Sequence, residues 1–455
     1  MIVCKFGGTS LSDAVQIKKV VSIMREDPRR RVMVVSAPGK RHANDTKVTD
    51  LLYQMAELAF CRLETDAVFQ VFEERLQETI YDLGLDGDLA SSLLRTLETR
   101  LSRKDLSKEA FFDQIVAFGE TCSARIITRY LNVNHLPARF VDPVAGGLLL
   151  HRVQGHTVID DKSYQKLGES LQPKKDGEII VMPGFYGGDE RGHIVTFSRG
   201  GSDISGAVAA AAIDAELYEV WSDVDHVYAV HPGLVHHPCP IHEMSYREMR
   251  ELAYIGFTIV HPEALQPVFD KRIPISVKNT NQPNGAGTNI VHERGPIDHP
   301  VTGIAAADHF CAVSMRRVLS NPQVGVLASI LNIFADEDIS IEHAPTGIDS
   351  VSIVIREVNF PPEKEERVVH RLIHELGFSP VVARNLSAVM LVGEGMLDSI
   401  TVVSRAAEAL ASQRISVEVM LQDYYEISIL FMMSEAERER AVPALYQEFF
   451  STCPD

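Results

Sequence analysis

The stretch IVCKFGGTS, residues 2–10, sets the fold class of this chain. Its first five residues form a mostly apolar run, and two glycines end that run in a turn. Lys5 then stands at the carboxyl end of a strand, and Gly7 and Gly8 let backbone amides approach a ligand. The pattern predicts an anion-binding turn. An ordinary strand-to-helix turn can also carry KxGG, and no GxxxxGK[ST] loop occurs in the sequence.

Short β-branched runs alternate with longer helical stretches from residue 2 to about residue 280. This alternation is typical of an α/β domain with a mostly parallel sheet covered by helices. We expect strands at residues 2–6, 31–36, 179–182, 193–197, 217–221 and 275–278. Between residues 56 and 114 the apolar spacing is helical, which predicts a helical insertion with a structural role.

A second glycine loop, FSRGGSDISGA at residues 197–207, leads into a predicted small-residue helix at 207–215. Arg199 can hold a carboxylate through two hydrogen bonds, and the amides at a helix start favour phosphate or carboxylate. Asp203 would either cap the helix or orient a substrate. Two such loops, one with lysine and one with arginine, predict phosphoryl transfer between two anions. A carboxylate acceptor is already ionised at neutral pH and needs no general base.

The segment NQPNGAGTNIVHERGPIDHP, residues 281–300, is rich in Pro, Gly and Asn and predicts a domain boundary near residue 300. Beyond it lies a diverged repeat: ISIE at 339–342 and ISVE at 415–418 are offset by 415 − 339 = 76 residues. An amphipathic helix precedes each copy, at 324–336 and 400–413, and a second strand follows at 351–353 and 427–429. Each copy could form a small βαββαβ sandwich, although chance likeness between two α/β segments is the alternative.

The composition bounds the partners and the location of the protein. A chain of 455 residues predicts two to four domains, and its net charge of −18 argues against nucleic acid or an anionic membrane as a general partner. No apolar run is long enough for a membrane span, and no export signal is visible. The six cysteines lack paired spacing, so we expect a reducing cytoplasm.

Three motifs resemble aspartate kinases: KFGGTS at 5–10, SRGGSD at 198–203 and WSDVDHVYAVHP at 221–232. SAPGK at 36–40, TKVTDLL at 46–52 and FGE at 118–120 also fall in the family's order, and the repeats are similar to its tandem ACT domains. The resemblance spans nearly the whole chain. It implies a monofunctional enzyme with an amino-acid kinase domain at 1–300, whose helical insertion is at about 56–114, and ferredoxin-like ACT domains at 301–384 and 385–455.

The resemblance implies that ATP and L-aspartate give 4-phospho-L-aspartate and ADP, the first step of lysine, threonine and methionine biosynthesis, with Mg²⁺ arriving on the nucleotide. Lys5 would stabilise the transferring phosphoryl group, and Asp203 would organise Lys5 and the substrate. Aspartate would be held by Thr49, Glu120, Arg199, Gly200, Gly201 and Ser202, with Glu120 meeting the ammonium and Arg199 a carboxylate. The ATP site would comprise Lys5, Gly7, Gly8, Ser222, Asp223 and Tyr228. Without the resemblance, Glu120 would be interpreted as a solvated helix charge.

The nucleotide segment departs from the family. Residues 227–233 read VYAVHPG where aspartate kinases usually have VYTADPR, so the usual Asp and Arg are missing. The spacing of His231, His236, His237, Cys239 and His242 matches none of the common zinc patterns, and we predict no metal held by protein side chains.

The resemblance places an amino-acid effector at Met315, Ser340, Ile341, Glu342 and Asp349 of the first repeat. These residues could equally form an interface between the repeats. The second repeat has QDYYE at 422–426 where the family commonly has QGSSE. We expect a homodimer or higher homo-oligomer formed through the ACT domains, with feedback by lysine, threonine or both. The alternatives are another acyl kinase of the superfamily, such as a glutamate kinase, and a non-catalytic amino-acid sensor.

Overall fold

The computed structural model describes residues 1–103, 105–153, 156–198, 200–257, 262–295, 299–317, 324–422 and 427–451. The chain divides into two compact units. The first unit comprises Met1–Val227, Pro240–Arg250 and Thr258–Arg294, and the second comprises Tyr228–Cys239, Glu251–Phe257 and Gly295–Asp455. The domain boundaries after residues 300 and 384 stay predictions.

An eight-stranded sheet forms the centre of the first unit, in the order β12-β14-β13-β9-β1-β2-β6-β3. Its strands are β1 (Ile2–Phe6), β2 (Arg30–Val35), β3 (Ala138–Phe140), β6 (Ile179–Pro183), β9 (Leu217–Ser222), β12 (Glu243–Ser245), β13 (Ile275–Asn279) and β14 (Thr288–Val291). Neighbours from β13 to β3 pair in parallel, and β14 runs antiparallel to β13. Every residue of the central strand β1 is buried, as expected for a parallel sheet covered on both faces. The predicted α/β class is confirmed.

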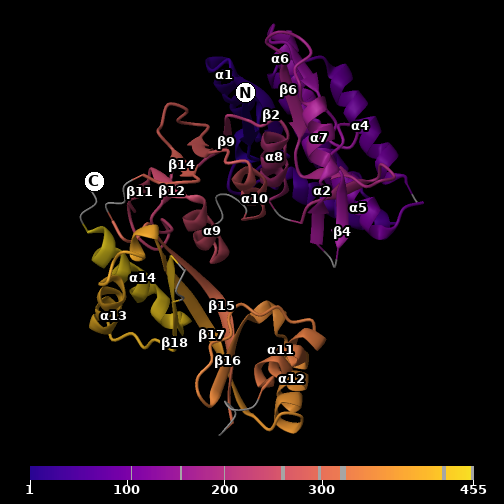
Figure 1. Ribbon diagram of the computed structural model, residues 1–455. Coiled ribbons are helices and arrows are strands. Elements are labelled where there is room, and N and C mark those ends of the chain that lie inside the picture. The colour runs from indigo at the N-terminus through magenta and orange to yellow at the C-terminus, as the bar shows by residue number, and fades with distance from the viewer. Residues whose placement is uncertain are drawn as a thin grey trace. The chain divides into compact units, whose positions relative to one another are not determined.

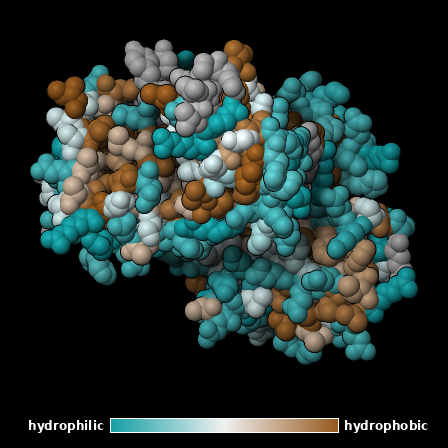
Figure 2. All heavy atoms as spheres, turned by 90° about the horizontal axis from the view of Figure 1, so that it is seen from below, coloured by the Kyte–Doolittle hydropathy of each residue, from teal (hydrophilic) through white to brown (hydrophobic). Residues whose placement is uncertain are grey.

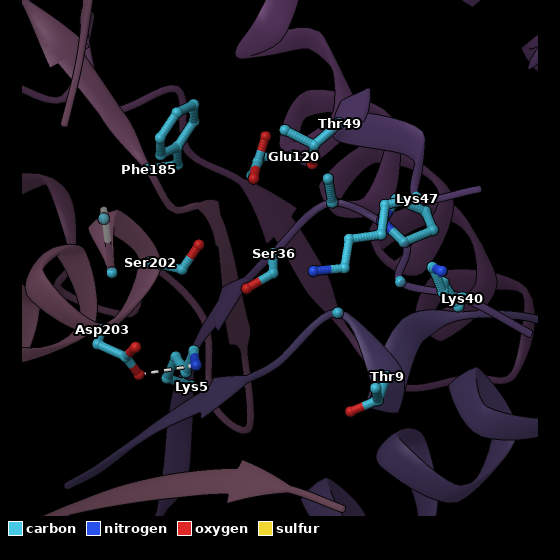
Figure 3. Close-up of a pocket in the computed structure, with 16 residues that line it drawn as sticks. Lys5, Thr9, Ser36, Lys40, Lys47, Thr49, Glu120, Phe185, Ser202 and Asp203 are labelled. Carbon is cyan, nitrogen blue, oxygen red and sulfur yellow. Dashed lines mark ion pairs between the residues drawn. The ribbon is translucent and has the colours of Figure 1, made fainter. Parts of the chain in front are cut away.

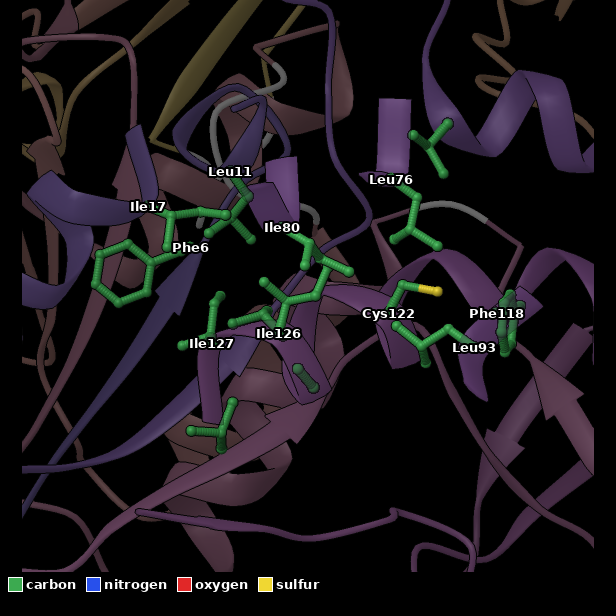
Figure 4. Close-up of a cluster of buried hydrophobic side chains, with 14 of the residues drawn as sticks. Phe6, Leu11, Ile17, Leu76, Ile80, Leu93, Phe118, Cys122, Ile126 and Ile127 are labelled. Carbon is green, nitrogen blue, oxygen red and sulfur yellow. The ribbon is translucent and has the colours of Figure 1, made fainter. Parts of the chain in front are cut away.

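Nine helices of the described residues accompany this sheet: α1 (Ala14–Glu26), α2 (Val48–Phe60), α3 (Asp66–Asp82), α4 (Gly87–Leu101), α5 (Lys108–Val116), α6 (Phe118–Val133), α7 (Lys162–Ser170), α8 (Gly201–Ala212) and α10 (Pro262–Asp270). Helix α9 (Tyr246–Tyr254) begins among the residues of the first unit and ends among those of the second. The insertion predicted at residues 56–114 is indeed helical. It does not form a core of its own, because Leu76 and Ile80 of α3 and Leu93 of α4 join the same apolar cluster as Phe6 of β1 (Figure 4).

Three predicted elements differ in the structure. The strand predicted at 193–197 is β8 (Ile194–Thr196), which pairs with β7 (Tyr186–Gly188) in a separate hairpin. The turn-rich segment 281–300 contains β14, which pairs with β13. The small-residue helix starts at Gly201 instead of residue 207, because Gly200 takes a left-handed conformation (φ 61°) and turns the chain into the helix. Two further hairpins pair β4 (Leu150–Val153) with β5 (His156–Ile159) and β10 (Val227–Tyr228) with β11 (Pro240–Ile241).

The second unit is built on an antiparallel sheet in the order β16-β15-β17-β19-β18. The strands are β15 (Gly303–Arg316), β16 (Ser350–Arg356), β17 (Ser379–Val392), β18 (Val419–Leu421) and β19 (Ser428–Ser434), and the helices are α11 (Val326–Asp336), α12 (Pro362–His374), α13 (Val402–Ser412) and α14 (Glu435–Phe450). Helices α11 and α12 lie beside β16, and α13 and α14 lie towards β18 (Figure 1).

The two repeats share their two long strands. Residues 310–316 of β15 pair with 379–386 of β17, and residues 303–307 of β15 pair with 388–392 of β17. One apolar core contains Phe334 and Ile353, and a separate core contains Ile304, Phe431 and Leu445. Ile304 therefore contributes to the core of the second repeat, although our predicted domain limits assign it to the first.

No helix in the described part of the chain is long and apolar enough to cross a membrane. On the face that Figure 2 shows, hydrophobic residues are interspersed among hydrophilic ones.

Candidate active site

A cavity of about 480 Å³ opens in the first unit where β1 and β2 end and α8 begins (Figure 3). It is lined by Lys5, Gly8, Thr9, Ser36, Ala37, Pro38, Gly39, Lys40, Lys47, Thr49, Glu120, Phe185, Gly200, Gly201, Ser202 and Asp203. Ligands of open α/β sheets bind at the carboxyl ends of the strands, so the cavity lies where the topology predicts it.

Lys5 joins the two glycine loops across this cavity. It is the fourth residue of β1, and only 8% of it is exposed. Its Nζ lies 2.7 Å from Asp203 Oδ1 on the first turn of α8. Asp203 does not cap the helix, since the structure shows no side-chain cap there. The pair fixes the lysine amino group at the cavity wall, and Lys5 retains donors that can reach a ligand.

Glycines are required where two loops touch behind the cavity. Gly39 N donates to Gly8 O at 2.7 Å, and a Cβ at Gly39 would lie 2.6 Å from Gly8 C. A side chain at either position would push apart the loops that follow β1 and β2. Gly201 is similarly enclosed, because a Cβ there would lie 2.7 Å from Phe185 Cδ2.

Glu120 is a buried carboxyl that has no counter-charge among the described residues. It lies on the first turn of α6, is 4% exposed and its Oε2 has no hydrogen-bond partner among the described residues. Burial raises the pKa of Glu120 to about 8, and a hydrogen bond from the Ala37 backbone opposes that rise. Figure 3 shows Glu120 beside Thr49, away from Lys5. Such a carboxylate is suited to a cationic group supplied by a ligand.

Four polar residues of the cavity, Thr9 among them, were missing from our predicted set. Ser36, Lys40 and Lys47 line it, and in Figure 3 Lys47 extends toward Ser36. The signal was present in the sequence, since SAPGK contains Ser36 and Lys40, and TKVTDLL contains Lys47. Of the residues in these motifs, the resemblance implied a ligand contact only for Thr49, and neither loop has a periodic pattern that shows which side chains turn inward.

The predicted nucleotide residues are only partly brought together. Strand β9 pairs with β1, which carries Lys5, and Gly7 N donates to Trp221 O at 3.0 Å near the end of β9. Ser222 is the last residue of β9, and Asp223 follows it. Neither of these two residues lines the cavity. Tyr228 falls in the second unit. Arg199, predicted to hold aspartate, lies outside the described residues.

The predicted effector residues lie in the second unit, where Glu342 already has partners. Tyr254 OH donates to Glu342 Oε2, and Arg356 Nε lies 3.4 Å from Glu342 Oε1. Met315 is 1% exposed, whereas Ser340 is exposed. Of the second repeat's QDYYE segment, residues 423–426 lie outside the described part.

Among the residues that the structure describes, no group of three or more His, Cys, Asp or Glu side chains could hold a metal ion. His226 and His242 do form an edge-to-face ring contact with centroids 5.3 Å apart.

Comparison with known proteins matches both parts of the chain to families. Residues 1–279 match the amino acid kinase family, and residues 389–449 match an ACT domain. The chain is 38% identical to Aspartokinase 3 of Bacillus subtilis over 452 residues, which covers 99% of each protein.

Solved structures show the same fold. The crystal structure of Clostridium acetobutylicum aspartate kinase, described as an allosteric enzyme, superposes with a TM-score of 0.87 at 33% identity, covering 99% of this chain and 100% of that one. E. coli aspartokinase III, solved with aspartate and ADP, superposes with a TM-score of 0.81 over 99% of this chain and 100% of that one; at 21% identity this likeness bears on the fold alone.

Proposed function

This chain belongs to the amino acid kinase family, as one of its aspartokinases, and from that premise we propose which residues carry its reaction. The enzyme transfers the terminal phosphoryl group of ATP to the side-chain carboxylate of L-aspartate, giving 4-phospho-L-aspartate and ADP. This is the first step of the aspartate pathway. The observation that carries the residue assignment is the cavity with Lys5 and Asp203 on one side and Glu120 on another (Figure 3).

Aspartate binds with its ammonium group on Glu120. No cation in the described part of the chain pairs with this buried carboxylate, so the ammonium supplies the charge that burial makes costly to leave unpaired. Thr49 lies beside Glu120 and offers a hydroxyl, and Gly200, Gly201 and Ser202 offer the start of α8 to a carboxylate. Arg199 stays a proposed carboxylate contact on the resemblance of the SRGGSD loop.

Lys5 stabilises the charge that develops during transfer. The acceptor carboxylate and the ATP phosphates are both anionic, so their repulsion is the main obstacle, and a fixed cation between them lowers the barrier. Asp203 keeps the amino group in place through the 2.7 Å ion pair. Gly7 and Gly8 let the phosphates approach the loop because neither residue has a side chain in the way. The amide of Gly8 is the proposed donor, since Gly7 N already donates to Trp221 O.

Lys40 and Lys47 supply further positive charge on the phosphate side of the cavity. This assignment offers a replacement for the arginine that the nucleotide segment lacks. Mg²⁺ fits the site as an ion carried by phosphate oxygens and water, since Asp203 is already paired with Lys5. Such an ion would neutralise phosphate charge. Ser222, Asp223 and Tyr228 remain the proposed nucleotide contacts.

The ACT repeats bind an amino-acid effector, lysine or threonine, and thereby regulate the kinase domain. Met315, Ser340, Ile341, Glu342 and Asp349 form the proposed effector site. The chain assembles as a homodimer or higher homo-oligomer through these repeats and resides in the cytoplasm. The two effectors, titrated singly and together, should change both activity and melting temperature; no change in either would contradict this regulation.

A hydroxamate trapping assay tests the catalytic assignment. The purified enzyme with MgATP should give the hydroxamate with L-aspartate and much less with glutamate or N-acetylglutamate. Preference for glutamate would favour a different acyl kinase, and no product with any acceptor would favour the non-catalytic sensor. The Lys5→Ala variant serves as the background, so product that survives this substitution removes the role given to Lys5.

A further inference from the structure

Arg75 is a buried cation in the helical insertion. It lies on α3, and only 4% of it is exposed. The next residue, Leu76, and Ile80 one turn later pack into the main apolar cluster of the first unit (Figure 4). The helix is therefore firmly anchored. A charged side chain in such a position must be satisfied by the groups around it.

The groups that satisfy Arg75 come from three different loop segments. Its Nη1 donates to Thr46 O at 2.7 Å, and its Nη2 donates to Ser12 O at 3.3 Å and to Gly39 O. Asp45 Oδ2 lies 3.4 Å from Nη1. A planar guanidinium with five donors can serve three carbonyl groups at once, which the single amino group of lysine cannot match in geometry.

These three segments build one side of the cavity. The loop after β1 carries Gly8 and Thr9, and it ends near Ser12. The loop after β2 carries Ser36 to Lys40, and the segment through Thr46 leads to Lys47 and Thr49 at the start of α2. Because Gly8 and Gly39 touch directly, a shift of one segment moves the others.

Other contacts hold the segment 40–47 less firmly. Arg41 pairs with Asp45 at 3.0 Å and with Glu78 of α3 at 2.8 Å. Glu78 is 61% exposed and Arg41 is 30% exposed, and exposed ion pairs contribute little to stability. Arg75 is thus the main link between the segment and α3.

We propose that Arg75 is a positioning residue for the phosphoryl transfer: it locks the three loops that place Gly8, Lys47 and Thr49 around the substrates. The inference rests on the proposed function, and it gives the helical insertion a part in catalysis beyond the structural role predicted from sequence. Arg75 itself does not line the cavity, so it acts only through the loops.

The test compares Arg75→Ala and Arg75→Lys with a matched control, Arg30→Ala. Arg30 is also a buried arginine of the first unit, 7% exposed, but it pairs with Glu219 at 2.8 Å and donates to Ile23 O at the opposite end of β2. For each purified full-length protein we would measure melting temperature, kcat and KM for both substrates, and MgADP affinity by calorimetry. The assays are repeated with millimolar methylguanidine and with the same concentration of sodium chloride.

We expect Arg75→Ala to lower kcat/KM for both substrates by about 100-fold, the size of effect that a misplacement of about 1 Å produces. Arg75→Lys should lose about tenfold because it reaches fewer carbonyls. Methylguanidine, and not sodium chloride, should restore part of the activity of Arg75→Ala. Arg30→Ala should lose melting temperature with kcat/KM unchanged within about threefold, and methylguanidine should not affect it.

Arg75 variants with kcat/KM within threefold of the parent would overturn the proposal. An activity loss that only follows the loss of melting temperature, as in the control, without methylguanidine rescue, would also overturn it. If Arg75→Ala does not fold, Arg75→Lys and its kinetics decide. If the parent enzyme phosphorylates no aspartate, the proposed function fails separately, and weaker MgADP binding in the Arg75 variants alone still tests the loop positioning.

Discussion

The cavity of the first unit and the Glu342 cluster of the second unit each contain a glutamate carboxylate, but the two carboxylates differ in how far protein groups already satisfy them. In the cavity, Glu120 is buried, and one of its oxygens has no partner within the ranges that the structure describes. In the second unit, Glu342 is already bonded to Tyr254 and paired with Arg356. A ligand of the cavity gains new contacts at little cost, whereas an effector at Glu342 must replace internal ones. The first arrangement suits a substrate site, and the second suits a site whose occupation changes the protein.

The largest effect is expected at Lys5. Lys5→Ala should lower kcat by about 1,000-fold, because a fixed cation that meets developing charge is among the strongest catalytic contributions. Steady-state kinetics with ATP and aspartate measure this. Lys18→Ala removes an exposed lysine that donates to Asp82 O and should leave kcat within about twofold. Loss of less than tenfold for Lys5→Ala would show that the cavity works without its central cation.

Glu120→Gln should separate binding from stability. Loss of a charge-assisted contact to the ammonium should lower kcat/KM for aspartate by about 100-fold. The KM for ATP should change little. The melting temperature near pH 8 should rise, because the variant no longer ionises a buried carboxyl. An unchanged kcat/KM, measured by the same kinetics, would mean that the ammonium binds elsewhere.

The pH dependence follows from the raised pKa of Glu120, about 8 in the folded chain. The neutral carboxyl prevails below that value, so the KM for aspartate should fall by up to about tenfold per pH unit as pH rises towards 8 and then level off. The stability that the neutral group contributes is fully present below its unfolded pKa and is lost as pH rises through about 8. Melting scans of the free and the aspartate-saturated enzyme check this, since bound aspartate should remove the trend. A KM that is flat across this range would contradict the assignment.

The smallest effect is expected at the Glu342 cluster. Tyr254→Phe removes one partner of Glu342 and should leave basal kcat within about twofold, with a stability cost of about 0.5 to 1 kcal/mol. If an effector competes with Tyr254, its half-saturating concentration should fall several-fold. Titration of lysine and threonine against activity measures this. An unchanged concentration would place effector binding away from Glu342.

Elements that depend on a short, continuous pattern of residues could be predicted from the sequence alone. Strand β1 matches its predicted limits, because an apolar run followed by two glycines has few other solutions. Lys5, Asp203 and Glu120 line one cavity, and the roles that the resemblance gives them stay predictions.

Features that depend on tertiary contacts were not predictable. Arg75 shares the buried face of α3 with Phe72 and Leu76, but its three carbonyl partners lie on loops distant in sequence, so the sequence pattern does not show that it links them. The start of α8 depends on the left-handed turn at Gly200, which a run of small residues does not reveal. The division of β15 and β17 between two cores requires knowing which strands pair.

The structure of this protein bound to L-aspartate and MgADP tests the account most directly. It should show the aspartate ammonium on Glu120, Lys5 facing the phosphate side while still paired with Asp203, and the loop contacts of Arg75 retained. The Tyr254 contact to Glu342 should persist without an effector. Aspartate bound with its ammonium away from Glu120, or Lys5 turned out of the cavity, would contradict the proposed site.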